Sequence, residues 1–561
     1  MRNSARRLSG VLLCAAAAVL FSFQHPASAW IAFFPVFLAV FYARLRFVWL
    51  YGGMYGALSY FLYLPWLFDF SRQAMVAACV AYFAFCALLF LSLKAAQLLC
   101  GRLFWIVQWL LVCAYEYLKT TGFAGFSYGV SAYSQWKVIP LMQCCDLFGV
   151  WGLSALLVFC SALLFRLFLT AAEEWSRLEL PGRRTKAPQM LRSAGTAARR
   201  SLFRHRTACL CFAAAVGLCY AYGFAVSARV WNADAAAEKM TVAAIQHNAD
   251  PWNGGLDVYR QDVRTLMRLT DEALQEDGRI ALAVWPETAV VVPIMRSWYG
   301  RHDAGRFALV SELLEWMDSK PCAFVVGNYH AEGNAGAASE DYNCAFLFEP
   351  GRNVLPPQPA QYAKRHLVPF TEYFPYEGQF PWIYRMLLDG DTHLWSPGTE
   401  AAVFSIGSLR FAAPICFEDT FGDGCRELVN GGARAFVNLS NDAWSKSLRC
   451  QMQHVQMAVF RSVESHVPSV RSTASGQTCL IASDGRIAAM SEPFAQNYVI
   501  GDIAVPGSAW RPSLYDRIGD VLGKAFAVLA AASLAAGGVW SASVRRSLKR
   551  ADKAAARAWQ A

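Results

Sequence analysis

The sequence has few charged residues for its length. Asp, Glu, Lys and Arg make up only 16% of its 561 residues, whereas 56% belong to the apolar set AVILMFWYC. Soluble globular proteins usually carry about 25% charged residues. The composition therefore excludes an ordinary soluble protein and predicts that much of the chain lies in a membrane.

Paired CxxC motifs are also absent, although the chain contains 17 cysteines. Most of them lie in apolar segments, where cysteine usually acts as a small packing residue. Cys144-Cys145 and Cys209-x-Cys211 lack the further His and Cys ligands that a zinc site requires. We therefore expect neither a metal nor another cofactor. The spacing leaves disulfide pairing open.

The apolar residues are concentrated in segments close to the ~20 residues that span a bilayer as a helix. Eight transmembrane helices are predicted, at residues 8–24, 28–43, 48–68, 74–93, 103–119, 148–168, 208–228 and 518–541. Cationic residues collect in the loop at about 171–206 and in the tail at 542–561. Because such residues mark cytoplasmic segments, we expect both termini to be cytoplasmic.

This topology divides the chain. Residues 1–229 are predicted to form a transmembrane domain of seven helices, and residues 238–505 to face the periplasm. One more transmembrane helix, at 518–541, precedes the basic cytoplasmic tail. The formal net charge of +10 is largely a signal of topology, so no nucleic-acid partner is expected. The first apolar segment also has the features of a cleavable signal peptide, and its removal would leave residues 238–505 on the same side.

One carboxylate lies inside a predicted membrane span. Glu116 is near the outer end of the segment 103–119, and carboxylates in a bilayer are costly enough to suggest a function. An ion pair with Lys119 beside a belt of aromatic residues is an equally good interpretation. The sequence leaves both open.

Residues 238–505 read as an α/β domain. Strands are predicted at 240–248, 279–287, 322–330, 343–350, 410–418, 433–442, 468–476 and 477–485, and helices at 256–276, 305–319 and 452–466. Continuous apolar strands that alternate with amphipathic helices are typical of a sheet covered by helices.

Three residues with useful chemistry lie at separate element ends of this domain. Glu287 and Cys416 end predicted strands, whereas Lys364 follows a proline-rich loop rather than a clear strand. Polar residues at strand ends can converge into a site. A cysteine nucleophile needs a base or a cationic neighbour, because a thiol with a pKa of ~8.5 is mostly protonated at neutral pH. Glutamate and lysine can supply both.

The motifs around these residues resemble the nitrilase superfamily. They are VWPET at Glu287, YAKRHLVPFTEYFP at Lys364 and PICFED at Cys416. Together with the predicted spans they resemble the apolipoprotein N-acyltransferase family, as do QHNADPW, NLSNDAW and the segment 453–476. The sequence departs from the family pattern twice. Phe417 stands where the family commonly has Tyr, and Ser445-Lys446 stand where it commonly has Phe-Gly.

The resemblance implies a multispan α-helical membrane domain, with about eight transmembrane helices, joined to a nitrilase-like αββα sandwich. It implies that the catalytic residues are Glu287, Lys364 and Cys416. It further implies that a group of supporting or substrate-positioning residues consists of Glu372, Glu418, Phe417, Asn441 and Trp252.

Simpler interpretations remain for several of these positions. Trp252 is equally a core or membrane-interface residue, and Asn441 and Asp442 equally cap a turn. His454 and His466 are predicted to lie on a helix surface. The aromatic segment 373–388 is predicted to be either a gate over the site or an interfacial anchor.

The activity implied by the resemblance is acyl transfer in a bacterial inner membrane. A phospholipid would donate the acyl chain through a cysteine thioester, and the acceptor would be the free α-amine of the diacylglyceryl-cysteine of an apolipoprotein. Nothing in the sequence requires more than a monomer. Two other classes of protein would explain part of this pattern, a membrane-anchored amidase and a transporter or scaffold. Eight spans exceed what an anchor needs, and the spans lack the run of charges expected of an ion pathway.

Overall fold

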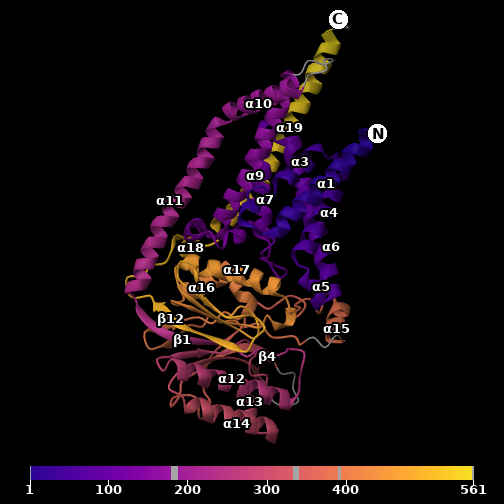
Figure 1. Cartoon of the computed structure of the whole chain (residues 1–561). Helices are drawn as coiled ribbons and strands as arrows, with labels where there is room; N and C mark the ends of the chain where they lie inside the picture. Colours follow the sequence, from indigo (N-terminus) through magenta and orange to yellow (C-terminus); the bar gives the residue numbers. More distant parts are fainter. Residues whose placement is uncertain (1, 179–186, 333–339, 390–392, 559–561) are drawn as a thin grey trace.

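The structure is a computed structural model that describes residues 2–178, 187–332, 340–389 and 393–558. It consists of a bundle of long helices at one end and a layered α/β domain at the other (Figure 1). Part of the predicted basic loop, including Arg183, Arg184 and Lys186, lies outside the described residues.

Helices occupy all the positions at which membrane spans were predicted. They are α1 (Arg2–Phe23), α3 (Phe34–Tyr42), α4 (Leu45–Tyr63), α6 (Arg72–Leu99), α7 (Phe104–Leu118), α9 (Cys145–Leu178), α11 (Arg206–Ala236) and α19 (Val521–Ala558). The other helices of this region are α2 (Pro26–Ala29), α5 (Trp66–Phe70), α8 (Ile139–Met142) and α10 (Ala187–Arg204).

The predicted number of eight spans is not confirmed. Among the described residues, four helices are long and apolar enough to cross a membrane: Arg72–Leu99, Cys145–Leu178, Arg206–Ala236 and Val521–Ser543. Leu8–Phe23 and Pro26–Tyr42 are shorter apolar segments. α7 has only 15 residues, and at 1.5 Å per residue it reaches about 22 Å of a hydrocarbon layer that is ~30 Å thick.

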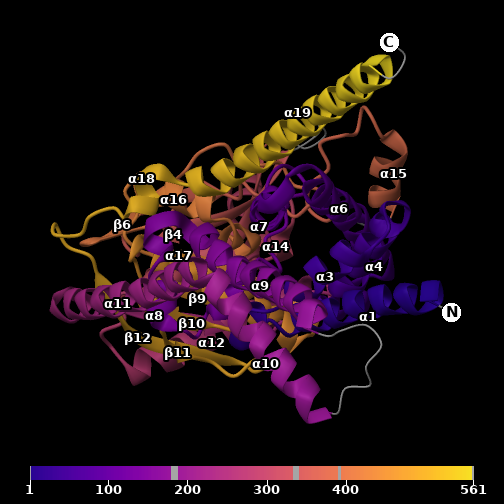
Figure 2. The ribbon, with the colours of Figure 1, turned by 90° about the horizontal axis from the view of Figure 1, so that it is seen from above.

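The helices of the bundle differ in how much of their surface is buried. The buried side chains of α3, α6, α7 and α9 form a common apolar core. α11 packs on this core near its start, through Ala208, Cys209 and Phe212, and reaches from α10 to the first strand of the α/β domain (Figure 1). Seen from above, α9 lies between α11 and α19 (Figure 2).

Two sheets packed face to face form the centre of the α/β domain. The six-stranded sheet has the order β12-β1-β2-β3-β4-β5 and the four-stranded sheet the order β11-β10-β9-β8. The strands are β1 (Glu238–Gln246), β2 (Leu282–Val284), β3 (Ala323–Glu332), β4 (Glu340–Phe348), β5 (Ala360–Ala363), β8 (Phe436–Ser440), β9 (Ser469–Thr473), β10 (Cys479–Ile481), β11 (Ile487–Met490) and β12 (Asn497–Val505). Apolar side chains of both sheets meet in one core between them.

Helices cover the outer face of each sheet and complete an αββα sandwich. α12 (Leu256–Glu276), α13 (Ile294–Gly300) and α14 (Ala304–Asp318) lie on the six-stranded sheet. α12 buries Val263, Leu266, Leu269 and Ala273, a spacing that places them on one helical face. α16 (Gly422–Asn430) and α17 (Leu448–Ser465) lie between the four-stranded sheet and the bundle (Figure 1).

Polar contacts join α17 and its surroundings to the bundle. The indole N–H of Trp66 donates to the Gln453 side chain at 2.8 Å, and Gln453 donates to the Tyr63 carbonyl at 2.9 Å. His466, which follows α17, lies 3.1 Å from the Asp146 carboxylate of α9. His466 is therefore a junction residue, and its predicted place on a helix surface is wrong because the sequence does not show what packs on α17.

Glu116 and Lys119 take separate partners. Glu116 is buried and accepts hydrogen bonds from the Ser131 backbone N–H at 3.0 Å and from the Ser131 hydroxyl at 2.5 Å. Lys119 donates to the Tyr60 hydroxyl at 3.0 Å and to the Tyr128 carbonyl at 3.2 Å. The interpretation of an ion pair between the two is therefore wrong.

Other predicted features lie within this frame. None of the 17 cysteines, all of which lie within the described residues, is joined in a disulfide. The segment 373–388 contains most of the short helix α15 (Pro381–Asp389), whose Trp382 side chain is 64% exposed. Nearby Tyr376 packs edge-on against Phe123 of the bundle, with ring centroids 5.3 Å apart. This aromatic segment thus lies beside the end of the domain that faces the helix bundle.

Candidate active site

The structure brings the ends of three elements together. Glu287 follows β2 by three residues, and Lys364 comes directly after β5. The expectation that Lys364 follows no strand is wrong, because a short strand after the proline-rich loop pairs with β4. The expectation that Cys416 ends a strand is also wrong. β7 (Leu409–Phe411) stops earlier, and Cys416 opens a 3-10 turn, η3 (Cys416–Thr420).

Lys364 lies between two carboxylates. Its ammonium is 2.9 Å from Glu287 Oε1 and 2.8 Å from Glu372 Oε1. The lysine is 1% exposed, so burial alone would lower its pKa, but Glu287 and Glu372 outweigh burial and hold the pKa well above the ordinary value. Lys364 is therefore cationic at neutral pH.

Backbone and amide groups fix the two carboxylates. Glu287 Oε1 accepts from the Asn343 amide at 2.9 Å, and its Oε2 accepts from the Asn441 backbone N–H at 3.0 Å. Glu372 Oε2 accepts from the Val368 N–H at 2.7 Å. β3 can pass beneath Glu287 because residue 327 is glycine: a Cβ there would lie 2.1 Å from the Pro286 carbonyl. The geometry of both carboxylates is thus set before any substrate binds.

Glu418 ties the lysine loop to the cysteine turn. Its carboxylate accepts from the backbone N–H groups of Arg365 at 2.8 Å and His366 at 3.0 Å, and from the Ile415 N–H at 2.8 Å. The Tyr362 hydroxyl donates to it at 2.9 Å. Since these partners flank Lys364 and Cys416, Glu418 sets the distance between the two loops.

Cys416 has the properties of a nucleophile that requires activation. Its φ of +49° is left-handed, a conformation that aims a side chain out of a tight turn. It is 8% exposed, and burial followed by the charge of Glu287 raises the pKa of its thiol well above the ordinary value. Lys364 and a hydrogen bond with Ser440 act in the opposite direction. The resting thiol is therefore protonated, and a base must remove the proton.

The remaining predicted residues lie at different distances from the three central residues. Phe417 is buried between Phe126 of the bundle and Phe421, with ring centroids 6.5 and 4.9 Å away. Asn441 contributes its backbone to the site, while its side chain accepts from the Ala443 N–H in a turn. Trp252 is 61% exposed, and its ring centroid lies 6.2 Å from that of Phe70. It does not touch the three central residues through any contact in the described structure.

The loop after β8 keeps a left-handed residue despite its unusual sequence. Lys446 has a φ of +45°, at the position where the family pattern commonly has glycine. The departure at Ser445-Lys446 therefore leaves the turn intact.

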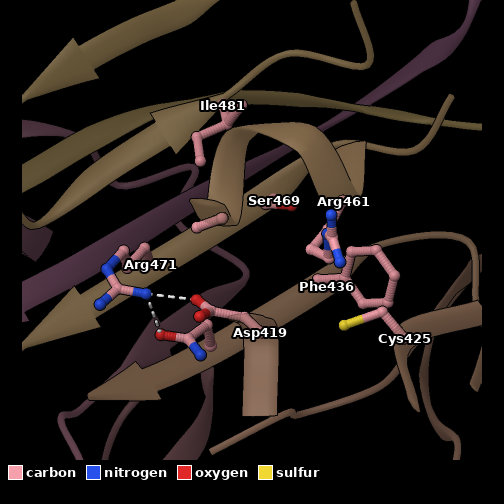
Figure 3. Close-up of a pocket in the computed structure, with 9 residues that line it drawn as sticks. Asp419, Cys425, Phe436, Arg461, Ser469, Arg471 and Ile481 are labelled. Atoms are coloured by element: carbon pink, nitrogen blue, oxygen red, sulfur yellow. Dashed lines mark hydrogen bonds and ion pairs between the residues drawn. The ribbon is translucent and has the colours of Figure 1, made fainter. Parts of the chain in front are cut away.

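A second charged cluster lies on the other side of Cys416, and sequence reasoning missed it. Asp419, Asp442, His454 and Arg471 are all buried. Arg471 donates to Asp419 and to the Asn438 amide oxygen, the two bonds drawn in Figure 3. A cavity of about 10 Å³ beside them has room for about one water molecule. The prediction that His454 lies on a helix surface is wrong, although two nearby carboxylates could not be inferred from its spacing.

One group in this cluster has the donor types of a metal site. Ligand atoms of Cys416, Asp442 and His454 lie within 4.8 Å of one another. However, both ring nitrogens of His454 already lie 2.9 Å from carboxylate oxygens. These residues do not fit a metal centre, because the imidazole has no free ligating atom.

The chain matches two family models. Residues 241–511 match the carbon-nitrogen hydrolase model, and residues 9–163 match the model of the apolipoprotein N-acyltransferase N-terminal domain. The sandwich with its carboxylate, lysine and cysteine cluster is thus a carbon-nitrogen hydrolase domain, the class that includes the nitrilases.

Curated relatives extend over nearly the whole chain. "Apolipoprotein N-acyltransferase 1" of Treponema pallidum is 41% identical, covering 95% of this chain and 96% of the relative. The protein of the same name from Treponema denticola is 36% identical, covering 91% and 93%. The chain therefore belongs to the apolipoprotein N-acyltransferase family. Among solved structures, Nit3 of Saccharomyces cerevisiae, of the nitrilase superfamily, is similar with a TM-score of 0.34 and 14% identity, covering 48% of this chain and 90% of Nit3.

Proposed function

We propose that this chain is a phospholipid:apolipoprotein N-acyltransferase that works through a Cys416 thioester. It would transfer a fatty acyl chain from a membrane phospholipid to the free α-amine of an N-terminal diacylglyceryl-cysteine, the last step of bacterial lipoprotein maturation. The observation that carries the proposal is the buried Glu287–Lys364–Glu372 cluster beside the turn that presents Cys416. Membership of the family and the names of its relatives supply the substrate class.

In the first half-reaction, Glu287 takes the thiol proton and the Cys416 sulfur attacks the carbonyl carbon of the phospholipid ester. The negative charge that develops on the carbonyl oxygen is stabilised by the cationic Lys364. The intermediate then breaks its carbon–oxygen bond, and the departing lysophospholipid oxygen receives the proton from Glu287. The thioester and lysophospholipid are the products.

In the second half-reaction, the neutral α-amine of the acceptor attacks the thioester carbonyl. Glu287 takes a proton from the attacking nitrogen and returns it to sulfur when the carbon–sulfur bond breaks. The amide product is a poor acyl donor, so transfer runs toward the acylated lipoprotein. Because the two substrates react in turn, the kinetics are expected to be ping-pong.

The positions of the chain ends and of the α/β domain support the proposed arrangement in the cell. The α/β domain lies at one end of the bundle, and the two chain ends lie at the other (Figure 1). This supports an inner-membrane protein with cytoplasmic termini, residues 1–229 and 518–541 in the membrane, a cytoplasmic tail at 542–561 and a periplasmic catalytic domain at 238–505. A monomer suffices, since all three proposed catalytic residues come from one chain. The supporting residues of the proposal are Glu372, Glu418, Phe417, Asn441 and Trp252.

The test is the intact mass of the purified protein after incubation with phospholipid alone. The wild-type protein is expected to gain one fatty-acyl mass that hydroxylamine removes, and Cys416→Ala should gain none. Cys322→Ala is the matched control, since this buried cysteine lies on the far side of the six-stranded sheet and should leave the adduct unchanged. Active protein without an adduct would overturn the thioester mechanism and favour a membrane-anchored amidase.

A further inference from the structure

The second charged cluster joins four separate elements beneath Cys416. Asp419 belongs to η3, Asp442 to the loop after β8, His454 to α17 and Arg471 to β9. Their exposed fractions are 4%, 1%, 3% and 0%, respectively. Charged groups are rarely buried this completely unless they are paired. The pairing in this cluster therefore determines how the four elements sit relative to one another.

His454 is the bridge within the cluster. Its Nε2 lies 2.9 Å from Asp419 Oδ1 and its Nδ1 lies 2.9 Å from Asp442 Oδ1. A neutral imidazole has one N–H and can donate to only one of the two carboxylates, whereas an imidazolium donates to both. The two carboxylates therefore favour the charged ring, whereas the Arg471 guanidinium, which can only donate, favours a neutral ring whose Nδ1 accepts from it at 2.8 Å.

The charges that face His454 support this protonation state. Burial and the neighbouring Arg471 alone would lower its pKa, but Asp442 and Asp419 outweigh them and raise the pKa to about 9. Burial would likewise raise the pKa of Asp442, but His454 and Arg471 lower it to about 2. The Arg471 guanidinium lies 2.8 Å from His454 Nδ1 and 3.0 Å from Asp442 Oδ2. Two cations thus share two carboxylates, and the cluster is neutral as a whole.

The bridge also reaches the residues of the proposed mechanism. Asp419 lies three residues after Cys416 in the same 3-10 turn. Asp442 directly follows Asn441, whose backbone N–H holds Glu287 Oε2 at 3.0 Å. His454 therefore connects the turn that carries the nucleophile to the loop that holds the base.

We propose that His454 is a positioning residue that acts as an imidazolium, tying the Cys416 turn to the Asn441-Asp442 loop and balancing the Asp442 charge beside the thiol. The inference deepens the proposed function and rests on it, since it assigns a supporting role around the same nucleophile. An oxygen of Asp442 lies within 4.8 Å of the Cys416 sulfur. With a neutral residue at 454 the cluster has one net negative charge, which disfavours the thiolate.

The test measures the thiol itself rather than acyl transfer. Carbamidomethylation of Cys416 by iodoacetamide is followed between pH 6 and 10 on the peptide that contains it, for the wild-type protein and for His454→Gln. Removing the positive charge is expected to shift the reactivity profile toward higher pH by about one unit or more, so the rate at a given pH should fall about tenfold. His302→Gln, at an exposed histidine outside the site, is the matched control and should not change the profile.

A double variant separates charge from structure. His454→Gln/Asp442→Asn removes one positive and one negative charge, so its reactivity should return toward the wild-type value even though two bonds are lost. A merely structural role predicts a double variant at least as impaired as the single one, and that outcome would overturn the proposal. An unchanged profile in His454→Gln would overturn it as well.

The wild-type protein allows a further test, which applies even if the variants do not fold. As the pH rises through about 9 and His454 loses its proton, thiol reactivity should rise less steeply than tenfold per pH unit. A uniform tenfold slope through this range would contradict the proposal. The failure of the proposed function is distinguishable, because it appears as a missing acyl adduct while the alkylation profiles stay as expected.

Discussion

Two clusters of buried charged residues flank Cys416, and they differ in their ratio of carboxylates to basic side chains. The cluster of Glu287, Glu372 and Lys364 holds two carboxylates and one cation. The cluster of Asp419, Asp442, His454 and Arg471 holds two carboxylates, one arginine and a histidine that we propose to be a cation. The first can take up a proton without leaving a charge unpaired, whereas the second loses its neutrality if any member changes. The proposed acid–base site and its proposed support thus combine carboxylates and basic side chains in different ratios.

Removal of the only cation from the first cluster should have the largest effect. Lys364→Met leaves Glu287 and Glu372 buried without a positive partner, and breaking a buried pair in this way costs about 3–5 kcal/mol. We expect a fall in the melting temperature and no acyl-enzyme.

Lys320→Met is the control, because Lys320 pairs with Asp271 at 2.6 Å near the surface, where such pairs contribute about 0–1 kcal/mol. Equal stability of the two variants would show that the ratio of charges in the first cluster does not matter.

Replacing the proposed base, Glu287, should slow acyl-enzyme formation with little effect on the stability of the protein. Glu287→Gln keeps the shape of the side chain and can still accept from Asn343, but it cannot take up the thiol proton. The rate of acyl-enzyme formation should fall about 10²–10⁴-fold, as expected for the loss of a general base. Glu312→Gln, at an exposed pair with Arg264, serves as the control. A variant that retains the full rate would mean that another group removes the proton.

The second charged cluster should make the stability of the protein depend on pH, through His454. The folded-state pKa of His454 is raised to about 9 from 6.5, so its contribution is fully present below pH 6.5 and is lost as the pH rises through about 9. The difference corresponds to about 3 kcal/mol. Thermal unfolding between pH 6 and 10 measures this loss. His454→Gln should flatten the profile in this range, and a variant profile as steep as that of the wild type would place the titration elsewhere.

A change at Glu418, which links the Lys364 loop to the Cys416 turn, should have the smallest of these effects. Glu418→Gln keeps one acceptor oxygen but turns an amide toward backbone donors, and one unsatisfied buried group costs about 1–3 kcal/mol. A modest loss of stability with slower acyl-enzyme formation is expected.

The control for this link is Glu427→Gln, whose carboxylate is half exposed and bonds only the Arg365 side chain among the described residues. If both variants behave alike, Glu418 does not set the spacing of the loops.

Sequence patterns predicted most of the sandwich. The amphipathic segment 256–276 has the same bounds as α12, and the apolar runs at 240–248 and 322–330 overlap β1 and β3. The run at 410–418 was predicted as one strand, but Ala412 and Ile415 form only isolated bridges to β8. Pro414 lacks a backbone donor and Cys416 is left-handed, and an apolar pattern reveals neither effect.

The site was predictable where residues sit in contiguous motifs and not where contacts join distant segments. VWPET, YAKRH and PICFED indicated the three central residues. His454, however, bonds carboxylates 12 and 35 positions away in the chain, and a helical pattern gives no sign of such partners. The number of spans was hard to predict for a similar reason. Apolar length alone does not show where Trp30–Phe33 interrupts the helix between α2 and α3.

The ladder between β1 and β12 has a consequence for how such a protein is assembled from parts. Glu238 lies opposite Val505, so the first and last residues of the sandwich strands are neighbours. A unit whose ends meet can be inserted at a single point of a host without spreading the elements on either side. Host and insert can then change independently in evolution, and in engineering the whole sandwich could be exchanged as a cassette through one short seam.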